Sequence, residues 1–378
     1  MKEKMIKAKI LRKIRRIFNN PKRWVSGRPV DSTLGGNAPL SLLEVSQPDP
    51  SQIAGQTLPE FPSYVAIEVT NVCNLRCKHC HYRFGLEHYT RDRGFINWET
   101  LKKVLSEVHG YNIPVLMNYD GEPLMHQDFL NFLKYAQELG LNTYFNTNGT
   151  LFDAEFADSI VQFYRGSIFF SVDGDREWFQ RIRVPANYDE VVKNLLYFIK
   201  VNEKFGWPIT VGVSLCNFGQ SSEERQKFLN KWIDRVNYIS MGEVNDKFGT
   251  VISDPMIDFT IKKRPICSVP WQTCGICHNG DVIPCSIYVT RANTANAIMG
   301  NIHQESLKNI WQGEHYQKFR QMVAQERYQE SFCNRCQRWR SQFLFNKSRM
   351  GDIEVERNGL WTTFRNMNKG NLNFRGSP

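Results

Sequence analysis

Three cysteines stand close together in the first quarter of the sequence. Cys73, Cys77 and Cys80 follow a C-x3-C-x2-C spacing within one short segment. Three thiolates at such intervals can hold three corners of a [4Fe–4S] cluster, which leaves the fourth iron open to bind another molecule. A structural zinc ion is the alternative, but it requires a fourth protein ligand, which His79 or His81 would have to supply.

A second group of cysteines lies in the last third of the chain. Its members are Cys267, Cys274, Cys277, Cys285, Cys333 and Cys336. The sequence has neither a secretory signal nor an apolar run of about 18 residues, which predicts a cytoplasmic protein. Thiols are kept reduced in that compartment, so clustered cysteines indicate metal ligation rather than disulfides. A zinc ribbon built from two C-x2-C pairs is one structural alternative.

Three polar turns carry further candidate residues. They are Asp120-Gly121-Glu122-Pro123, Thr147-Asn148-Gly149-Thr150 and Ser171-Val172-Asp173-Gly174. Each turn alone would be ordinary, because Asn-Gly and Asp-Gly pairs favour turns. Each of them, however, lies at the end of an apolar segment that is expected to be a strand.

Alternating strands and helices are predicted between residues 64 and 264. Strands are expected at 65–70, 115–119, 142–146, 167–172, 209–215 and 237–241, and helices at 98–109, 129–139, 154–163, 188–202 and 223–233. Six such units predict an α/β fold whose parallel sheet is arranged as an incomplete TIM-type barrel. Reactive groups gather at the carboxyl ends of the strands in these folds, and there the first cysteine group and all three turns lie.

The segment Asn71-Val-Cys73-Asn-Leu-Arg-Cys77-Lys-His-Cys80 resembles the signature of the radical S-adenosylmethionine (SAM) superfamily. The resemblance implies a partial (β/α)6 barrel and a cluster whose open iron chelates the amino and carboxylate groups of SAM. Reductive cleavage of SAM would then yield methionine and a 5′-deoxyadenosyl radical that abstracts a hydrogen atom from the substrate. A flavodoxin- or ferredoxin-type electron donor is implied as partner.

The first polar turn resembles the Gly-Gly-Glu-Pro motif of this superfamily, with Asp120 in place of the first glycine. The resemblance implies that Gly121 lets the backbone approach the methionine part of SAM. It also implies that Glu122 accepts a hydrogen bond from the SAM ammonium group.

The other two turns fall where the superfamily places further SAM contacts. By resemblance, Asn148 and Ser171 would meet the ribose or the carboxylate of SAM, and Asp173 would line the pocket. Arg183 lies where many relatives carry an arginine that pairs with the SAM carboxylate.

The C-terminal cysteines resemble a SPASM domain, a module that holds auxiliary clusters in many radical SAM enzymes. The resemblance is carried by the spacing from Cys267 to Cys285 and by the Met-Gly-Asn-Ile run at 299–302. Because no cysteine follows Cys336, it implies one auxiliary [4Fe–4S] cluster, as in the shortened twitch version. The implied ligands are Cys267, Cys285, Cys333 and Cys336. Cys274 and Cys277 would either replace one ligand or be free buried thiols, and we favour the second.

The net charge of +10 is concentrated at the N-terminus. Residues 1–28 contain eleven basic residues and one acid, so the rest of the chain is formally neutral and nucleic-acid binding is not expected. Apolar residues at every fourth position predict that residues 1–18 form a basic amphipathic helix, suited to peripheral binding at the inner face of a membrane or to docking on the protein itself. The expected parts are this helix (1–28), a linker (29–63), the radical SAM core (64–264), the SPASM/twitch domain (265–345) and a C-terminal tail (346–378).

An auxiliary cluster commonly accepts an electron from the substrate radical in relatives, which predicts a two-electron oxidation. We expect the substrate to be an alcohol on a sugar or aminocyclitol, as a small molecule or a glycan, with Glu243 and Asp246 as candidate bases. Peptide modification is the alternative, although the N-terminal region is too short and basic for a leader-binding domain. Ser286 also replaces the Asp base of sulfatase-maturating relatives. A zinc-stabilised binding protein is the third interpretation, which the intact Glu122 and Asp173 disfavour.

Overall fold

The protein is described from a computed structural model. The described residues are 58–80, 91–243, 264, 266–285, 297–336, 345–350, 352–358 and 361–368. The expected N-terminal helix and Asp246 therefore lie outside the described residues. Within the described part, no helix is both long enough and apolar enough to span a bilayer.

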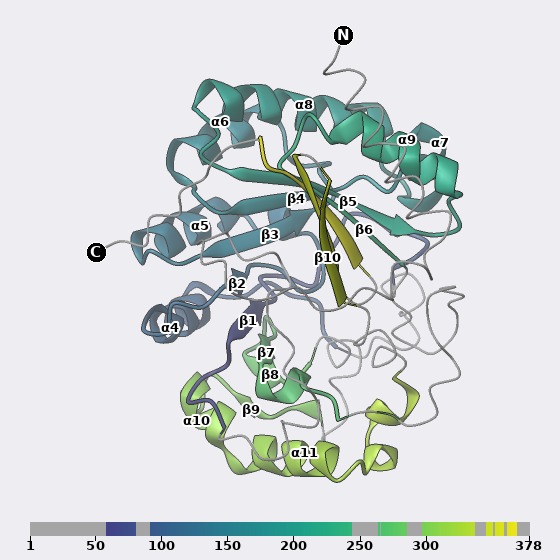
Figure 1. Ribbon diagram of the computed structural model, residues 1–378. Helices are drawn as coiled ribbons and strands as arrows, with labels where there is room; N and C mark the ends of the chain where they lie inside the picture. The colour runs from purple at the N-terminus through teal and green to yellow at the C-terminus, as the bar shows by residue number, and fades with distance from the viewer. Residues whose placement is uncertain are drawn as a thin grey trace.

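Six parallel strands form the centre of the molecule (Figure 1). They are β1 (Tyr64–Ile67), β2 (Val115–Leu116), β3 (Thr143–Thr147), β4 (Ser167–Ser171), β5 (Thr210–Asn217) and β6 (Tyr238–Glu243). Each strand pairs with the next one along the chain, so their order in space repeats their order in sequence. This arrangement confirms the predicted α/β fold with a partial TIM-type barrel.

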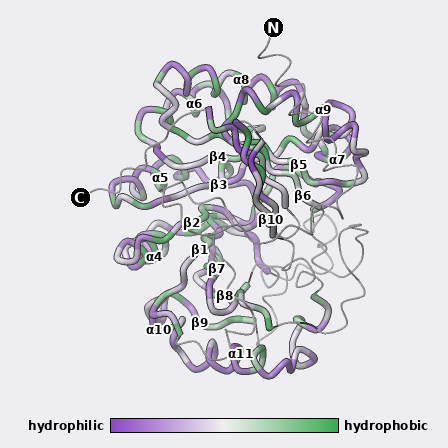
Figure 2. The backbone as a smooth tube through the Cα atoms, in the orientation of Figure 1, coloured by the Kyte–Doolittle hydropathy of each residue, from purple (hydrophilic) through white to green (hydrophobic). Residues whose placement is uncertain are grey.

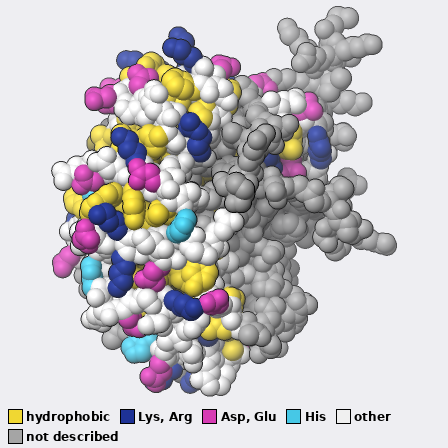
Figure 3. All heavy atoms as spheres, turned by 90° about the vertical axis from the view of Figure 1, so that its left-hand side faces the viewer, with side chains coloured by type: hydrophobic (Ala, Val, Ile, Leu, Met, Phe, Trp, Pro, Cys, Tyr) yellow, Lys and Arg dark blue, Asp and Glu magenta, His cyan; other side chains and the backbone are white. Residues whose placement is uncertain are grey.

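Helices cover one face of this sheet. They are α4 (Trp98–His109), α5 (Phe129–Glu138), α6 (Ala154–Phe163), α7 (Arg176–Ile182), α8 (Tyr188–Lys204) and α9 (Ser222–Trp232). In α4, Leu101, Val104, Leu105 and Val108 form a buried stripe, and the side chain of Asn97 caps the first turn. On the outer face that carries α4 and α5, Lys and Arg side chains alternate with Asp and Glu (Figure 3).

The two faces of the strands differ in character. In β5, Val213 and Leu215 are fully buried under the helices, whereas the alternate residues Ser214 and Cys216 are partly exposed. Figure 2 shows hydrophobic residues gathered along the central strands, while the helices alternate between hydrophilic and hydrophobic positions. The helix-facing side is therefore the main core, and the opposite, inner side of the barrel offers polar groups.

The SPASM region continues the same sheet on the other side of β1. It contains β7 (Thr273–Ile276), β8 (Asp281–Ile283), β9 (Gly300–Asn301), α10 (Leu307–Gln312) and α11 (Glu314–Ala324), with short 3-10 turns η3 (Val269–Trp271), η6 (Tyr328–Glu330) and η7 (Phe332–Arg335). Strand β7 pairs in parallel with β1 over four residues. The auxiliary region is thus attached to the strand that precedes the cysteine loop.

The segment expected to be a tail contains an antiparallel ribbon. Its strands are β10 (Phe345–Met350), β11 (Ile353–Asn358) and β12 (Trp361–Asn366). Strand β12 pairs with β6, so the ribbon extends the far edge of the barrel sheet and completes a sheet of twelve strands (Figure 1). Val355 and Phe364 bury their side chains against the barrel core, which explains why the ribbon is folded onto it.

Candidate active site

The first cysteine group occupies the loop that follows β1, as predicted. Cys77 is buried, while Cys73 and Cys80 are partly exposed. The backbone amides of Arg76 and Lys78 donate hydrogen bonds of 2.7 and 2.8 Å to the carbonyls of residues 184 and 182. The loop is therefore held by the last residue of α7 and by the segment that follows it.

Burial and neighbouring charges shift the pKa values of these thiols. Burial raises the pKa of Cys73 to about 11, and the amide of Leu75, which donates to the Cys73 sulfur at 3.5 Å, acts in the opposite direction. Burial likewise raises the pKa of Cys77, and the Arg183 guanidinium opposes it. Thiols that burial keeps protonated become ligands when a metal charge favours the thiolate. Ligation of an iron–sulfur cluster by Cys73, Cys77 and Cys80 stays a prediction.

Glu122 ties the loop after β2 to the end of β3. Its carboxylate accepts hydrogen bonds of 2.7 Å from the Thr147 hydroxyl and 2.7 Å from the Asn148 amide, and a longer one from the Leu124 amide. Burial raises its pKa to about 7, although these three donors favour the ionised form. The predicted contact of Glu122 with the SAM ammonium group stays a prediction; the structure adds a second role, the alignment of two adjacent strand ends.

Gly121 is required by close backbone packing. Its φ of 68° is a left-handed conformation, and an added Cβ would lie 2.6 Å from the carbonyl oxygens of Thr70 and Val72. The next amide, that of Glu122, donates to the Val72 carbonyl at 2.8 Å. This turn is thus packed directly on the root of the cysteine loop.

Asn148 faces the cysteine loop through a residue that sequence analysis missed. Its side-chain amide donates to the Asn74 side chain at 2.8 Å, and Asn74 in turn donates to the Thr150 hydroxyl at 2.8 Å. Asn74 lies between Cys73 and Cys77, so its position inside the cysteine motif was the available signal. The end of β3 and the cluster loop are held together by this amide pair.

Asp173 links three parts of the site. It follows β4 in a left-handed conformation (φ 51°) and is fully buried. Its carboxylate accepts from the Cys216 amide at 2.7 Å, and its other oxygen lies 2.7 Å from Arg183 Nε and 3.7 Å from His79 Nε2. Arg183 also reaches the sulfur of Cys77 at 4.0 Å. The structure therefore joins two predicted SAM-pocket residues to the cluster loop.

This arrangement keeps a buried cation beside Cys77 of the cysteine loop. Burial alone would lower the pKa of Arg183, but the charges of Asp173 and Cys77 outweigh it and hold the pKa above its ordinary value. Burial lowers the pKa of His79, which favours the neutral imidazole. Arg183 therefore carries its charge at all working pH values, and its predicted contact with the SAM carboxylate stays a prediction. Ser171, at the end of β4, is partly exposed on the inner face.

Two of the four predicted auxiliary-cluster ligands, Cys267 and Cys333, lie near Tyr328. The pKa of Tyr328 is raised to about 12, first by burial and in part by the nearby Cys267 and Cys333. Cys336 follows Cys333 after a single turn, with its amide donating to the Cys333 carbonyl at 3.1 Å. Cys285 lies beyond the end of β8, and its charge acts on Tyr119.

Cys274 and Cys277 lie in and directly after β7, where both are buried. Burial raises the pKa of Cys277 well above its ordinary value and also raises that of Cys274. Burial raises the pKa of Cys73 and Cys77 in the same way, so the interpretation of Cys274 and Cys277 as free buried thiols stays a prediction. The candidate bases stay untested, because Asp246 and the side chain of Glu243 fall outside the described residues.

Two family profiles match the sequence. The radical SAM superfamily matches residues 67–231, and the iron–sulfur cluster-binding domain SPASM matches residues 267–337. The first match contains the cysteine loop and all three turns, and the second contains all four predicted auxiliary ligands.

Curated relatives carry a range of activities. The tungsten-containing aldehyde ferredoxin oxidoreductase cofactor-modifying protein of Pyrococcus furiosus is 22% identical over 300 residues, which cover 68% of this chain and 83% of that protein. An AdoMet-dependent heme synthase of Oleidesulfovibrio alaskensis is 28% identical over 39% of this chain and 38% of its own length. Mycofactocin maturase MftC of Mycobacterium tuberculosis is 27% identical over 36% of this chain. The chain spans little more than a third of the last two proteins.

Solved structures share the fold at low sequence identity. SuiB of Streptococcus suis, bound to its precursor peptide SuiA, superposes with a TM-score of 0.56 at 16% identity, over 70% of this chain and 67% of SuiB. The protein anSMEcpe with bound AdoMet gives a TM-score of 0.51 at 15% identity, over 74% of this chain and 90% of that chain. These likenesses show the shared fold. The two profile matches, which contain the cysteine loop and the strand-end turns, identify the chain as a radical SAM enzyme with a C-terminal SPASM domain, whose cofactors are SAM and [4Fe–4S] clusters.

Proposed function

We propose that this enzyme oxidises a secondary alcohol of a sugar or aminocyclitol to a ketone. The clusters and SAM, when bound, supply the electron and the hydrogen-abstracting radical. In the balanced reaction the substrate loses one hydrogen atom to that radical, one proton to a base and one electron to the auxiliary cluster. Glu243 and Asp246 remain our proposed bases, and a flavodoxin- or ferredoxin-type protein is the proposed electron donor.

A row of hydroxyl groups across the inner face carries the substrate proposal. Ser171, Ser214 and Ser240 are direct neighbours on β4, β5 and β6, and Thr363 on β12 continues the row. All four residues are partly exposed, and none of their hydroxyls forms a hydrogen bond with another described residue. Adjacent strands lie about 4.8 Å apart, so the row extends over roughly 14 Å. It begins at Ser171, a predicted SAM contact.

The inner-face residues next to this row, two positions before and after it along β6 and β12, also suit a polyhydroxylated ring. Above it, the ring of Trp361 lies on Gly242, where an added Cβ would come within 2.3 Å of the indole. Below it, Arg365 stacks on Tyr238 at 5.5 Å. Neutral hydroxyls beside a flat aromatic surface can accept and donate hydrogen bonds without requiring a charged substrate. This combination favours a sugar-like molecule.

Peptide modification is the second candidate, and the comparisons support it. One curated relative is named a mycofactocin maturase, and SuiB was crystallised with a precursor peptide. A peptide would present amide groups rather than ring hydroxyls to the same inner face. Peripheral membrane attachment through residues 1–18 is a further proposal, based on their charge pattern alone.

The first experiment tests cluster binding and SAM cleavage, which need no knowledge of the substrate. The anaerobically reconstituted protein should contain about eight iron atoms per chain and form 5′-deoxyadenosine from SAM and dithionite. A triple alanine variant of Cys73, Cys77 and Cys80 should hold about four iron atoms and form none. Zinc in place of iron, with SAM left intact, would instead support the binding-protein interpretation.

The second experiment separates the two substrate classes. Monosaccharides, aminocyclitols and short peptides are added in turn, and deoxyadenosine formation and loss of two hydrogen atoms from each compound are measured. A polyol that is converted should have a KM raised about 2- to 13-fold by Thr363→Ala, which removes one hydrogen bond. Thr362→Ala is the matched control, because Thr362 pairs with Met241 on the opposite face. Conversion of peptides alone would reject the sugar proposal.

A further inference from the structure

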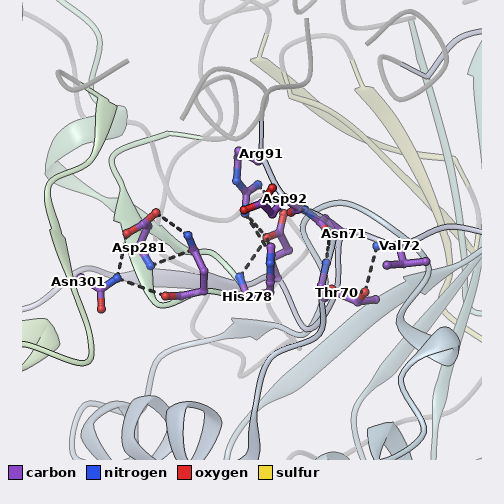
Figure 4. Close-up of polar contacts among 11 residues, drawn as sticks. Thr70, Asn71, Val72, Arg91, Asp92, His278, Asp281 and Asn301 are labelled. Atoms are coloured by element: carbon purple, nitrogen blue, oxygen red, sulfur yellow. Dashed lines mark hydrogen bonds and ion pairs between the residues drawn. The ribbon is translucent and has the colours of Figure 1, made fainter. Parts of the chain in front are cut away.

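Two buried charged side chains, Glu68 and Arg91, meet the partly exposed His278 where the barrel meets the SPASM region. Figure 4 shows Arg91 and His278 at this junction. The Glu68 carboxylate, fully buried just after β1, pairs with both terminal nitrogens of Arg91, one of them at 2.8 Å. It also accepts from the His278 backbone amide and from His278 Nδ1, each at 3.0 Å. We call these three residues the Glu68 clamp.

The clamp joins segments that are far apart in sequence. Glu68 precedes the cysteine loop by five residues, whereas Arg91 begins the segment 91–95 that follows it. His278 belongs to the turn between β7 and β8, in the SPASM region. Nδ1 of His278 lies 3.0 Å from the Glu68 carboxylate, which accepts, and 3.4 Å from an Arg91 nitrogen, which donates. The shorter contact to Glu68 is a hydrogen bond when Nδ1 carries the proton.

The segment that Arg91 opens is fastened to the root of the cysteine loop. The Thr70 hydroxyl donates to the Gly94 carbonyl at 2.7 Å, and the Asn71 side chain bonds both the Asp92 carbonyl at 2.8 Å and the Gly94 amide at 2.9 Å (Figure 4). An added Cβ on Gly94 would lie 2.6 Å from the His278 ring. The loop root, the segment 91–95 and the SPASM turn are therefore packed as one unit, immediately before Cys73.

Other contacts attach the SPASM region to the barrel without involving this unit. The Trp311 indole donates to the Pro59 carbonyl at 2.9 Å, and the Leu307 amide donates to the Glu107 carboxylate at 2.7 Å. His303 lies 3.4 Å from the Thr100 hydroxyl on α4. The two regions are therefore also joined at points away from the clamp, and the clamp is the junction that reaches the root of the cysteine loop.

We propose that the Glu68 clamp positions the cysteine loop, so that His278 of the SPASM region controls the rate of SAM cleavage without touching SAM. Glu68 precedes the loop, Arg91 opens the segment that is bonded to the start of the loop at Thr70 and Asn71, and His278 connects both to the auxiliary region. A displacement of about 1 Å in a reacting group can cost roughly 100-fold in rate. The proposal rests on radical SAM chemistry and not on the identity of the substrate.

The test compares three substitutions at two histidines of the same interface. His278→Leu removes the hydrogen bond to Glu68, His278→Asn restores a donor near the position of Nδ1, and His303→Leu removes a ring that does not contact the loop root. Deoxyadenosine formation from SAM and dithionite is measured per iron bound. Hydrogen exchange of amides 70–80 is measured on the chain before and after reconstitution, with amides of α8 as reference.

We expect His278→Leu to lower the rate between about 10- and 100-fold, and to speed exchange at 70–80 but not in α8. His278→Asn should recover most of the rate, and His303→Leu should resemble the parent. Arg91→Lys, which keeps the charge but loses the paired contact, provides a milder variant if His278→Leu does not take up iron. Parent-like rate and exchange in His278→Leu, or an equal loss in His303→Leu, would overturn the proposal.

Discussion

Glu122→Gln tests whether burial or hydrogen bonding determines the pKa of Glu122, the residue bonded to the end of β3. Glutamine has the shape of glutamate, so its amide oxygen can still accept from the Asn148 amide, and its nitrogen can donate to the Thr147 hydroxyl. The weaker contact with the Leu124 amide, at 3.4 Å, would be lost. We therefore expect the variant to fold. The lost hydrogen bond should lower its free energy of unfolding by about 1–3 kcal/mol near neutral pH, apart from the effect of Glu122 ionisation in the parent.

The ionisation effect has a definite sign. Burial raises the pKa of Glu122 from an ordinary value of 4.5 to about 7. The folded chain therefore holds a proton that the unfolded chain releases, so this contribution to stability is complete below pH 4.5 and is lost as pH rises through 7. Proton linkage between these two values gives a loss of about 2 kcal/mol from pH 5.5 to 8.5. Glutamine has no such dependence.

Urea unfolding under anaerobic conditions at pH 5.5, 7 and 8.5, followed by tryptophan fluorescence, measures the free energy of unfolding of both proteins. Their difference at each pH cancels the other titrating groups. The stability of the parent relative to Glu122→Gln should fall by about 2 kcal/mol across this range. A difference that is flat, or that grows in favour of the parent, would mean that the three donors keep Glu122 ionised and that burial does not dominate.

Two further predictions concern the clusters and their surroundings. Asp173→Asn should lower the free energy of unfolding by about 3–5 kcal/mol, because Arg183 would remain buried without its ion pair. Adding Arg183→Met should recover part of this loss in a double-mutant cycle measured by urea unfolding, whereas additive losses would contradict the pairing. Chemical analysis of Cys285→Ser should show a loss of about four iron atoms. Cys274→Ser should keep its iron and lower the free energy of unfolding by about 1–3 kcal/mol, because it buries a hydroxyl. Iron loss from Cys274→Ser would make Cys274 a ligand.

The barrel could be predicted from sequence because its signals are local. Helix α4 has the predicted bounds, 98–109, and strand β4 lies within one residue of its predicted range. The positions of the three turns at strand ends follow from the same pattern. What each turn contacts could not be predicted, since the bond from Asn148 to Asn74 depends on how neighbouring strand ends are aligned in space.

The ribbon from β10 to β12 was expected to be a tail for a physical reason. Its strands alternate polar and charged residues with few apolar ones, and their partner, β6, lies more than a hundred residues earlier in the chain. Strand preference depends on such neighbours more than on the segment itself. Likewise, His278 carries no motif, and only the pairing of β7 with β1 brings it to Glu68.

Asp173 shows why the site is better understood as one unit than as separate residues. A left-handed conformation costs an ordinary residue roughly 1–2 kcal/mol, and surrounding contacts must maintain it. Here the contacts are the Cys216 amide and Arg183, and Arg183 is also the cation next to Cys77. The same ion pair therefore holds the strained end of β4 and sets the charge beside the cluster loop. A change in either partner must alter both properties together, so a variant that loosens β4 while leaving the environment of Cys77 unchanged is not expected.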